Sequence, residues 1–205
     1  MIDWLIFLPA CFALNLAFGP SNLLAMTHGS RRGMGFAQRA ACARLLVFVP
    51  MIALSALGLG VLLTASAALF TVLKVAGATY LIWLGVSLWR GAEAVPTQVV
   101  QGHELTLRRA FRAEALVAMS NPKALLIFAA FFPQFVVVER YWQSYAMLGA
   151  AFIAMEAVAI AVYAALGRFA ARFTSARLPA VQRTSGATMV LFGLLLLLSP
   201  QPSRS

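Results

Sequence analysis

The sequence predicts an all-α fold, that of a polytopic membrane protein with six transmembrane helices. Of its 205 residues, 62% are hydrophobic and only 11% are charged, whereas a soluble domain carries about 25% charged residues. The chain divides into six apolar runs of roughly 20 residues, the length that a ~30 Å hydrocarbon core requires. Basic residues gather in alternate loops between these runs, as is typical of membrane proteins.

The six spans follow one another with short loops, apart from one longer stretch in the middle. The N-terminal Met-Ile-Asp-Trp lacks the basic segment of a cleaved signal peptide, so we expect the first apolar run to remain as a membrane helix. Pro200 and Pro202 end the last run. The expected spans are residues 4–26, 40–63, 69–89, 115–138, 145–167 and 186–199.

The formal charge of +10 is distributed along the chain as the positive-inside rule predicts, and not as a nucleic-acid-binding surface. Three alternate loops and their flanks hold eleven of the sixteen Lys and Arg residues, so we expect these loops in the cytoplasm and both termini outside it. The eleven are Arg31, Arg32, Arg39, Arg90, Arg108, Arg109, Arg112, Arg168, Arg172, Arg177 and Arg183, whereas the opposite side holds Arg140 and Arg204.

Segment 119–135 places polar residues and prolines inside a membrane span. It carries Asn121-Pro122-Lys123 at one end and Pro133 at the other. Proline has no N–H and leaves the carbonyl four residues earlier without its donor, and in lipid other groups must supply the missing bond. The pattern predicts a broken helix that lines a cavity, and a helix with a structural kink is the alternative.

The same pattern recurs in the first span and predicts an internal repeat. Pro9 and Pro20 are eleven residues apart, as are Pro122 and Pro133, and aligning the pairs matches Pro20 with Pro133. We therefore expect the first and fourth helices to be broken.

Gly-Ala-Thr occurs at 77–79 in the third span and again at 186–188 in the sixth. Because each half holds three spans, an odd number, the halves are predicted to be inverted repeats. Many secondary transporters follow this plan, with the binding site at the repeat interface. The prediction is a single transmembrane transporter domain over 1–205, with repeat one at 1–89, a cytoplasmic linker at 90–112 and repeat two at 113–200.

Ionisable residues inside spans are functional candidates because each costs about 2.5–3.5 kcal/mol at a helix centre. Lys123 can meet a substrate carboxylate, and the alternative is that its side chain extends to the nearby interface. Arg44 and Glu156 occupy nearly equivalent places in the two halves, and Glu156 is the one carboxylate well inside a predicted span. Glu156 is therefore a candidate proton carrier, and a fixed ion pair with Arg44 is the alternative.

Five motifs follow one another along the chain. They are Gly-Pro-Ser-Asn at 19–22, Gly-Ser-Arg-Arg-Gly at 29–33, Gly-Ala-Thr-Tyr-Leu-Ile-Trp-Leu-Gly at 77–85, Asn-Pro-Lys-Ala-Leu-Leu-Ile-Phe at 121–128 and Pro-Gln-Phe at 133–135. With these motifs, the chain resembles the LysE/RhtB family of bacterial amino-acid exporters over most of its length. The resemblance implies an inner-membrane exporter of amino acids or close derivatives, coupled to proton antiport. The sequence departs from the family at Ala17-Phe18, where members usually have Thr-Pro, and at 40–44, where they usually have glycines.

The breaks and the motifs together predict the site residues. Arg44 and Glu156 are the candidates for proton coupling. The candidates for substrate binding are Asn15, Gly19, Pro20, Ser21, Asn22, Tyr80, Asn121, Pro122 and Lys123.

We expect no metal, cofactor or nucleic acid. His28 and His103 are expected in loops without partners at metal-ligand spacing, Cys11 and Cys42 fit small buried hydrophobic positions, and no nucleotide motif is present. The expected partners are an amino acid, protons and the lipid bilayer, and the formation of a homo-oligomer stays open. The alternatives are an exporter of another small solute or a cation, which would need several buried carboxylates, and a membrane-embedded enzyme, which would need a nucleophile with a base or a metal cluster.

Overall fold

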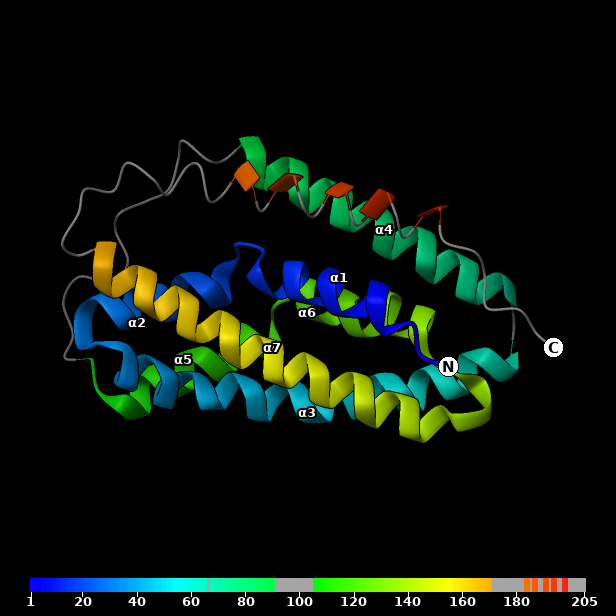
Figure 1. The fold of residues 1–205 in the computed structure, drawn as a ribbon, viewed down its shortest axis with the longest axis horizontal. Helices are drawn as coiled ribbons and strands as arrows, with labels where there is room; N and C mark the ends of the chain where they lie inside the picture. The colour runs from blue at the N-terminus through cyan, green and yellow to red at the C-terminus, as the bar shows by residue number, and fades with distance from the viewer. Residues whose placement is uncertain are drawn as a thin grey trace.

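In the computed structural model, every regular element of the described residues is helical, as the sequence predicts (Figure 1). The structure describes residues 1–65, 67–90 and 105–170, together with 183–184, 186–187, 190–191, 193–194 and 197–198. The elements are α1 (Trp4–Leu16), α2 (Pro20–Arg32), α3 (Met34–Ala65), α4 (Ala67–Arg90), α5 (Leu107–Met119), α6 (Pro122–Leu126), the π-helical turn η2 (Ile127–Phe131), the 3₁₀ turns η3 (Phe132–Phe135) and η4 (Val138–Arg140), and α7 (Tyr141–Ala170).

The first predicted span consists of two helices, α1 and α2, joined at a sharp bend of 61°. α1 ends before Ala17, and Pro20 occupies the first turn of α2, where a helix makes no use of the missing N–H. Pro9 lies inside α1 and does not end it. The first helix is therefore broken as predicted, at Gly19-Pro20 alone.

A tight turn at Gly33 joins α2 to α3. Its φ of 83° lies in the left-handed region that favours glycine. The turn lies at the end of the bundle where α5 begins and α7 ends (Figure 1). We call this the basic end because it gathers Arg31, Arg32, Arg108, Arg109 and Arg168.

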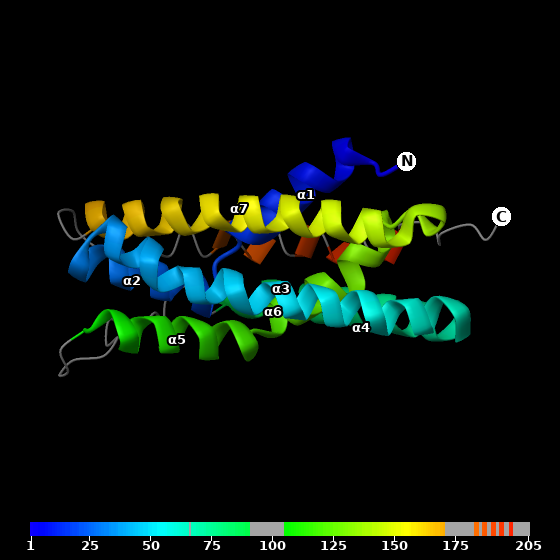
Figure 2. The ribbon, with the colours of Figure 1, turned by 90° about the horizontal axis from the view of Figure 1, so that it is seen from below.

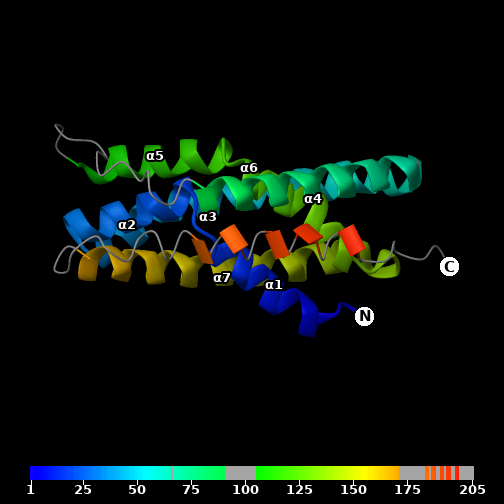
Figure 3. The ribbon, with the colours of Figure 1, turned by 90° about the horizontal axis from the view of Figure 1, so that it is seen from above.

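Two long helices, α3 and α7, run the length of the bundle and pack against each other and against α2. Figures 2 and 3 show α7 and α5 on opposite sides of α2, and α1 diverging from α7 toward the N-terminus. The predicted spans 40–63, 69–89 and 145–167 lie within α3, α4 and α7, each of which extends past its prediction at both ends.

The fourth predicted span is also broken, with a bend of 53° between α5 and the segment that follows Pro122. Beyond α6 the chain passes through η2 and then η3, where Pro133 sits in the first turn. A π-helical turn pairs each carbonyl with the N–H five residues later. For Phe128 that residue is Pro133, which has no N–H, and Ser55 Oγ donates to the Phe128 carbonyl instead at 2.5 Å.

The two breaks favour an alignment of the halves that differs from the predicted one. Pro20 and Pro122 each begin the helix that follows a break, whereas Pro9 lies inside a helix. These positions favour an alignment of Pro20 with Pro122, whereas the eleven-residue spacing aligned Pro20 with Pro133; a membrane helix tolerates a proline such as Pro9 within its length. The repeat itself stays a prediction.

The described residues of the sixth predicted span lie beside α4 (Figure 1). A Cβ added at Gly85 would lie 2.5 Å from the Gly186 carbonyl oxygen, and one at Gly193 would lie 2.9 Å from that of Ala78. Such close backbone approach requires small residues. The two contacts run antiparallel, which supports the inverted repeat as a prediction, and residues 91–104 of the predicted linker are outside the described part.

Aromatic side chains form the core between α1, α3, α7 and the fourth span, centred on Phe7, Phe48, Phe128, Phe132 and Phe152. Large apolar side chains such as Leu46, Leu54 and Val158 lie on the outside, where a bilayer would cover them. Among the described residues, two helices, Met34–Gly58 and Val138–Phe169, are long and apolar enough to cross a membrane, and up to four spans result if each bent pair is one. The six-helix count therefore remains a prediction.

Candidate functional site

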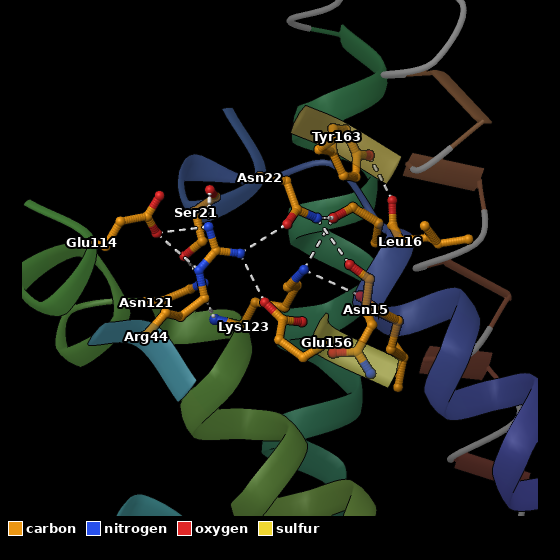
Figure 4. Close-up of polar contacts among 12 residues, drawn as sticks. Asn15, Leu16, Ser21, Asn22, Arg44, Glu114, Asn121, Lys123, Glu156 and Tyr163 are labelled. Atoms are coloured by element: carbon orange, nitrogen blue, oxygen red, sulfur yellow. Dashed lines mark hydrogen bonds and ion pairs between the residues drawn. The ribbon is translucent and has the colours of Figure 1, made fainter. Parts of the chain in front are cut away.

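The two helix breaks touch each other in the middle of the bundle (Figure 4). Asn121, the residue before Pro122, donates from Nδ2 to the Ser21 hydroxyl at 3.0 Å. The Asn121 Oδ1 accepts the backbone N–H of Lys123 at 3.1 Å and so caps α6. The Gly-Pro break and the Asn-Pro break thus form one polar junction between the two halves of the chain.

Side chains satisfy the carbonyls that the first break leaves open at the end of α1. The Lys123 ammonium donates to the carbonyls of Leu14 and Ala17 at 3.1 and 3.0 Å. Asn22 Nδ2 donates to the carbonyls of Asn15 and Ala17 at 2.9 and 3.0 Å. These bonds are the replacement that a helix end buried in an apolar environment needs.

Tyr163 of α7 completes this replacement. Its hydroxyl donates to the Leu16 carbonyl at 2.7 Å. In a continuous helix this carbonyl would accept the N–H of residue 20, but residue 20 is a proline. The carbonyl end of a helix carries partial negative charge, which suits the Lys123 cation. Lys123 is buried, so it does not extend to the interface as the alternative prediction held.

Arg44 of α3 is fully buried and binds groups from three other elements. Its Nε and Nη2 donate to Glu114 Oε2 of α5 at 3.0 and 2.7 Å. Its Nη1 donates to Glu156 Oε1 of α7 at 2.8 Å and to Asn22 Oδ1 of α2 at 3.1 Å. Nη2 also donates to the Ser21 carbonyl. The guanidinium therefore links both carboxylates to the first break.

Glu114 is a buried carboxylate that sequence reasoning missed, so Glu156 is not the one carboxylate inside a span. The fourth span was expected to begin at residue 115, but Thr106 caps α5 through its hydroxyl and the helix starts at Leu107. Glu114 then lies seven residues into the helix instead of in a linker. The Thr-Leu-Arg-Arg start of α5 is the signal that could have found it.

His28 was expected in a loop but lies buried in α2. Its Nδ1 is 3.2 Å from Glu114 Oε1, although the two atoms are not aligned as a hydrogen bond. The described residues thus place two cations, Arg44 and Lys123, at the first break, and Arg44 pairs with two carboxylates. Charges buried in this way are stable only when they are paired, and removing one partner strands the other.

The remaining predicted residues are placed as follows. Asn15 donates from Nδ2 to the Cys11 carbonyl at 2.9 Å, while its Oδ1 has no hydrogen-bond partner within the described part of the chain. Tyr80 lies in α4, and its side chain is outside the description. Cys11 is buried as expected, whereas Cys42 is exposed on α3.

A cavity of ≈ 550 Å³ opens at the end of the bundle opposite the basic end. It lies between the start of α1 and the start of α7, and its volume is in the range of small-molecule sites. Its lining residues are Met1, Ile2, Trp4, Val137, Glu139, Arg140, Gln143, Ser144 and Met147. Across the described residues, no group of three His, Cys, Asp or Glu side chains could hold a metal ion.

Comparison with known proteins places the chain in a family. The model of the LysE type translocator family matches residues 12–200. An uncharacterized membrane protein of Pseudomonas aeruginosa is 36% identical over 86% of this chain and 81% of its own length, and one of Vibrio cholerae is 30% identical over 83% of each. The homoserine/homoserine lactone efflux protein of Salmonella typhi is 30% identical over 94% of this chain and 95% of its own. No solved structure matches the chain. With helix breaks at its Gly-Pro and Asn-Pro motifs, this chain belongs to the family of LysE type translocators.

Proposed function

We propose that this protein is a secondary exporter of amino acids or close derivatives, exchanged for protons by alternating access. The family supports a transport role, and two Salmonella relatives are named homoserine/homoserine lactone efflux proteins. The observation that carries the proposal is the position of Lys123. Its ammonium lies on the open carbonyls of α1, at the junction between the two breaks.

An amino acid carries the groups that this junction is built to bind. The substrate ammonium replaces that of Lys123 on the carbonyls of Leu14 and Ala17, since both groups are three-donor cations. Lys123 then binds the substrate carboxylate, with the Asn121 amide as a second donor. Asn15 Oδ1, which has no hydrogen-bond partner in the described part of the chain, offers one more acceptor.

The packing of the helices differs between the two ends of the bundle. At the basic end, α2 and α7 cross in close contact at Gly29, where an added Cβ would overlap the backbone of Ala164, and at Gly167, where it would overlap Met26. At the other end, the cavity between α1 and α7 is open. We assign this arrangement to a state of the transporter that is closed toward the basic end. Export then requires that α2 and α7 move apart at the basic end at another stage of the transport cycle.

The proposed site of proton coupling is the cluster of Arg44 with Glu114 and Glu156. Glu156 faces the junction from α7 and binds Arg44 through one oxygen, Oε1. A carboxylate that alternates between this pair and a bound proton can drive transport, whereas a permanent pair would be structural. The localisation proposed is the bacterial inner membrane, with the basic end in the cytoplasm and both termini outside.

A reconstitution experiment tests the exporter role. The purified protein is reconstituted into liposomes that contain unlabelled homoserine. The uptake of labelled homoserine by exchange is then measured, with and without a panel of other amino acids as competitors. We expect exchange by the wild type and none by Lys123→Ala. Lys74→Ala is the matched control, because Lys74 is the other lysine of the sequence and lies in a different helix. Normal exchange by Lys123→Ala would refute the proposed role of Lys123, and no exchange by the wild type with any amino acid of the panel would refute the proposed substrate class.

A further inference from the structure

We infer that His28 and Glu114 form a proton-binding pair through which the exporter exchanges its coupling proton with the solution at the basic end. The inference rests on the proposed function and deepens it, because it names residues that move the proton. Among the described residues, the ion-pair partners of His28 and Glu114 are each other and Arg44, and none of these belongs to the junction where the substrate is proposed to bind. They meet between α2 and α5, closer to the basic end than Arg44.

The pair holds two polar atoms that lack partners and face each other. His28 is 2% exposed and Glu114 is fully buried. His28 Nδ1 and Glu114 Oε1 are 3.2 Å apart, and neither makes an aligned hydrogen bond to any group in the described part of the chain. Buried polar atoms are normally satisfied, so an unsatisfied pair requires an explanation. One proton shared between the two atoms would satisfy both.

The two oxygens of Glu114 have different surroundings. Oε2 accepts two hydrogen bonds from Arg44, at 2.7 and 3.0 Å, and has no room for a further donor in a typical geometry. Oε1 has no hydrogen-bond partner in the described part of the chain, and His28 Nδ1 lies 3.2 Å from it. A proton that arrives on His28 Nδ1 can therefore pass to Oε1, which leaves a neutral imidazole and a neutral carboxylic acid. No other bond changes, and the proton returns by the reverse step.

Protonation of Glu114 changes the position of Arg44 in the cluster. With Glu114 ionised, the guanidinium is shared by two carboxylates on opposite sides. With Glu114 neutral, Coulomb attraction favours Glu156. The same guanidinium holds the Ser21 carbonyl and the Asn22 amide of the first break, so a shift of Arg44 reaches the junction where the substrate is proposed to bind.

The pair is shielded from the solution by a side chain near the basic end. The Phe36 ring packs edge-on against the His28 imidazole, with ring centroids 6.0 Å apart. The Arg32 guanidinium lies 5.3 Å from the centroid of the same ring. Within the described residues, the charged groups linked to the pair by these contacts are Arg32 of α2, through Phe36, Arg44 of α3 and, beyond Arg44, Glu156 of α7. Displacement of the Phe36 ring would open the route for the proton.

The test measures proton binding separately from transport. Infrared difference spectra between neutral and acidic pH report the protonation of buried carboxylates in the purified wild type, Glu114→Gln and His28→Gln. We expect a carboxylic-acid band that is absent in Glu114→Gln and altered in His28→Gln. The control variants are His103→Gln and Glu104→Gln, which change the other histidine and a carboxylate of the predicted linker. Identical bands in the wild type and Glu114→Gln would overturn the inference, whatever the substrate proves to be.

Transport measurements provide the second arm. In liposomes with an imposed pH gradient, we expect His28→Gln to lose accumulation of labelled homoserine to the level seen without a gradient, while the linker controls accumulate it as the wild type does. Gradient-driven accumulation by His28→Gln at the wild-type level would overturn the inference and leave the exporter role intact. Exchange by the wild type without any response to the gradient would overturn proton coupling as a whole.

Discussion

Replacing Arg44 tests whether one guanidinium holds both buried carboxylates. Arg44→Met removes the cation from a site with no solvent exposure and strands Glu114 and Glu156. Breaking a buried ion pair by removal of one partner costs about 3–5 kcal/mol. At ~2–4 °C per kcal/mol for a chain of this length, the melting temperature of the purified protein should fall by about 6–20 °C.

The structure makes this prediction more specific through two combined variants. If Arg44 paired with Glu156 alone, Arg44→Met with Glu156→Met would restore stability, because no charge would remain unpaired. Arg44 also donates two hydrogen bonds to Glu114, so this double variant still leaves one carboxylate stranded. We expect it to stay destabilised, and we expect the triple variant Arg44→Met, Glu114→Gln, Glu156→Gln to recover most of the loss.

Thermal unfolding in detergent, followed by tryptophan fluorescence and by size-exclusion chromatography of heated samples, measures each difference. A double variant as stable as the wild type would refute the claim that Glu114 depends on Arg44. Transport by the triple variant then separates the two roles of the cluster. Failure of a folded triple variant to accumulate substrate against a gradient supports proton carriage by the carboxylates, whereas normal accumulation would show that the charges are structural.

Three further predictions concern other parts of the chain. Lys123→Arg should fold but exchange substrate poorly, because a planar guanidinium does not replace a compact ammonium on two carbonyls; wild-type exchange rates would contradict this. Gly29→Ala should destabilise the protein or abolish transport, since its Cβ would overlap the backbone of Ala164, whereas Gly35→Ala, with open space around it, is a control expected to change neither. A reporter fused after Ser205 should be active only if it functions outside the cytoplasm, and activity of a cytoplasm-restricted reporter there would reverse the proposed orientation.

Residue types were sufficient to predict the two breaks, because proline acts on its own helix. Pro20 follows Gly19 and Pro122 follows Asn121, and both preceding residues suit the start of a helix. The helices are broken at both prolines, as expected. The same reasoning overvalued Pro9, because the effect of a proline inside a membrane helix depends on neighbours that one sequence does not reveal.

The polar network depends on side chains that are far apart in the sequence, and only part of it could be predicted. The Arg44–Glu156 pair was predicted because both residues are charged, lie inside apolar runs and follow Pro20 and Pro133 at nearly equal distances along the chain. Glu114 was not, because an error of a few residues at a helix start decides whether a carboxylate is in a linker or in a span. The role of His28 could be predicted only after that of Glu114, since a histidine near a helix end does not indicate a functional site until its partner is known.

The polar junction between the two helix breaks bears on both the stability of the fold and the proposed transport. Part of the contact between the two halves is made by aromatic side chains, whose separation leaves no polar group unsatisfied. Separation at the polar junction has a different consequence, because Lys123, Asn22 and Tyr163 satisfy carbonyls that would otherwise be buried without donors. Separation of the breaks therefore needs a replacement donor at the end of α1. An amino-acid ammonium is such a donor, and this gives a physical reason for the two halves to move when substrate is bound and to stay closed when it is not.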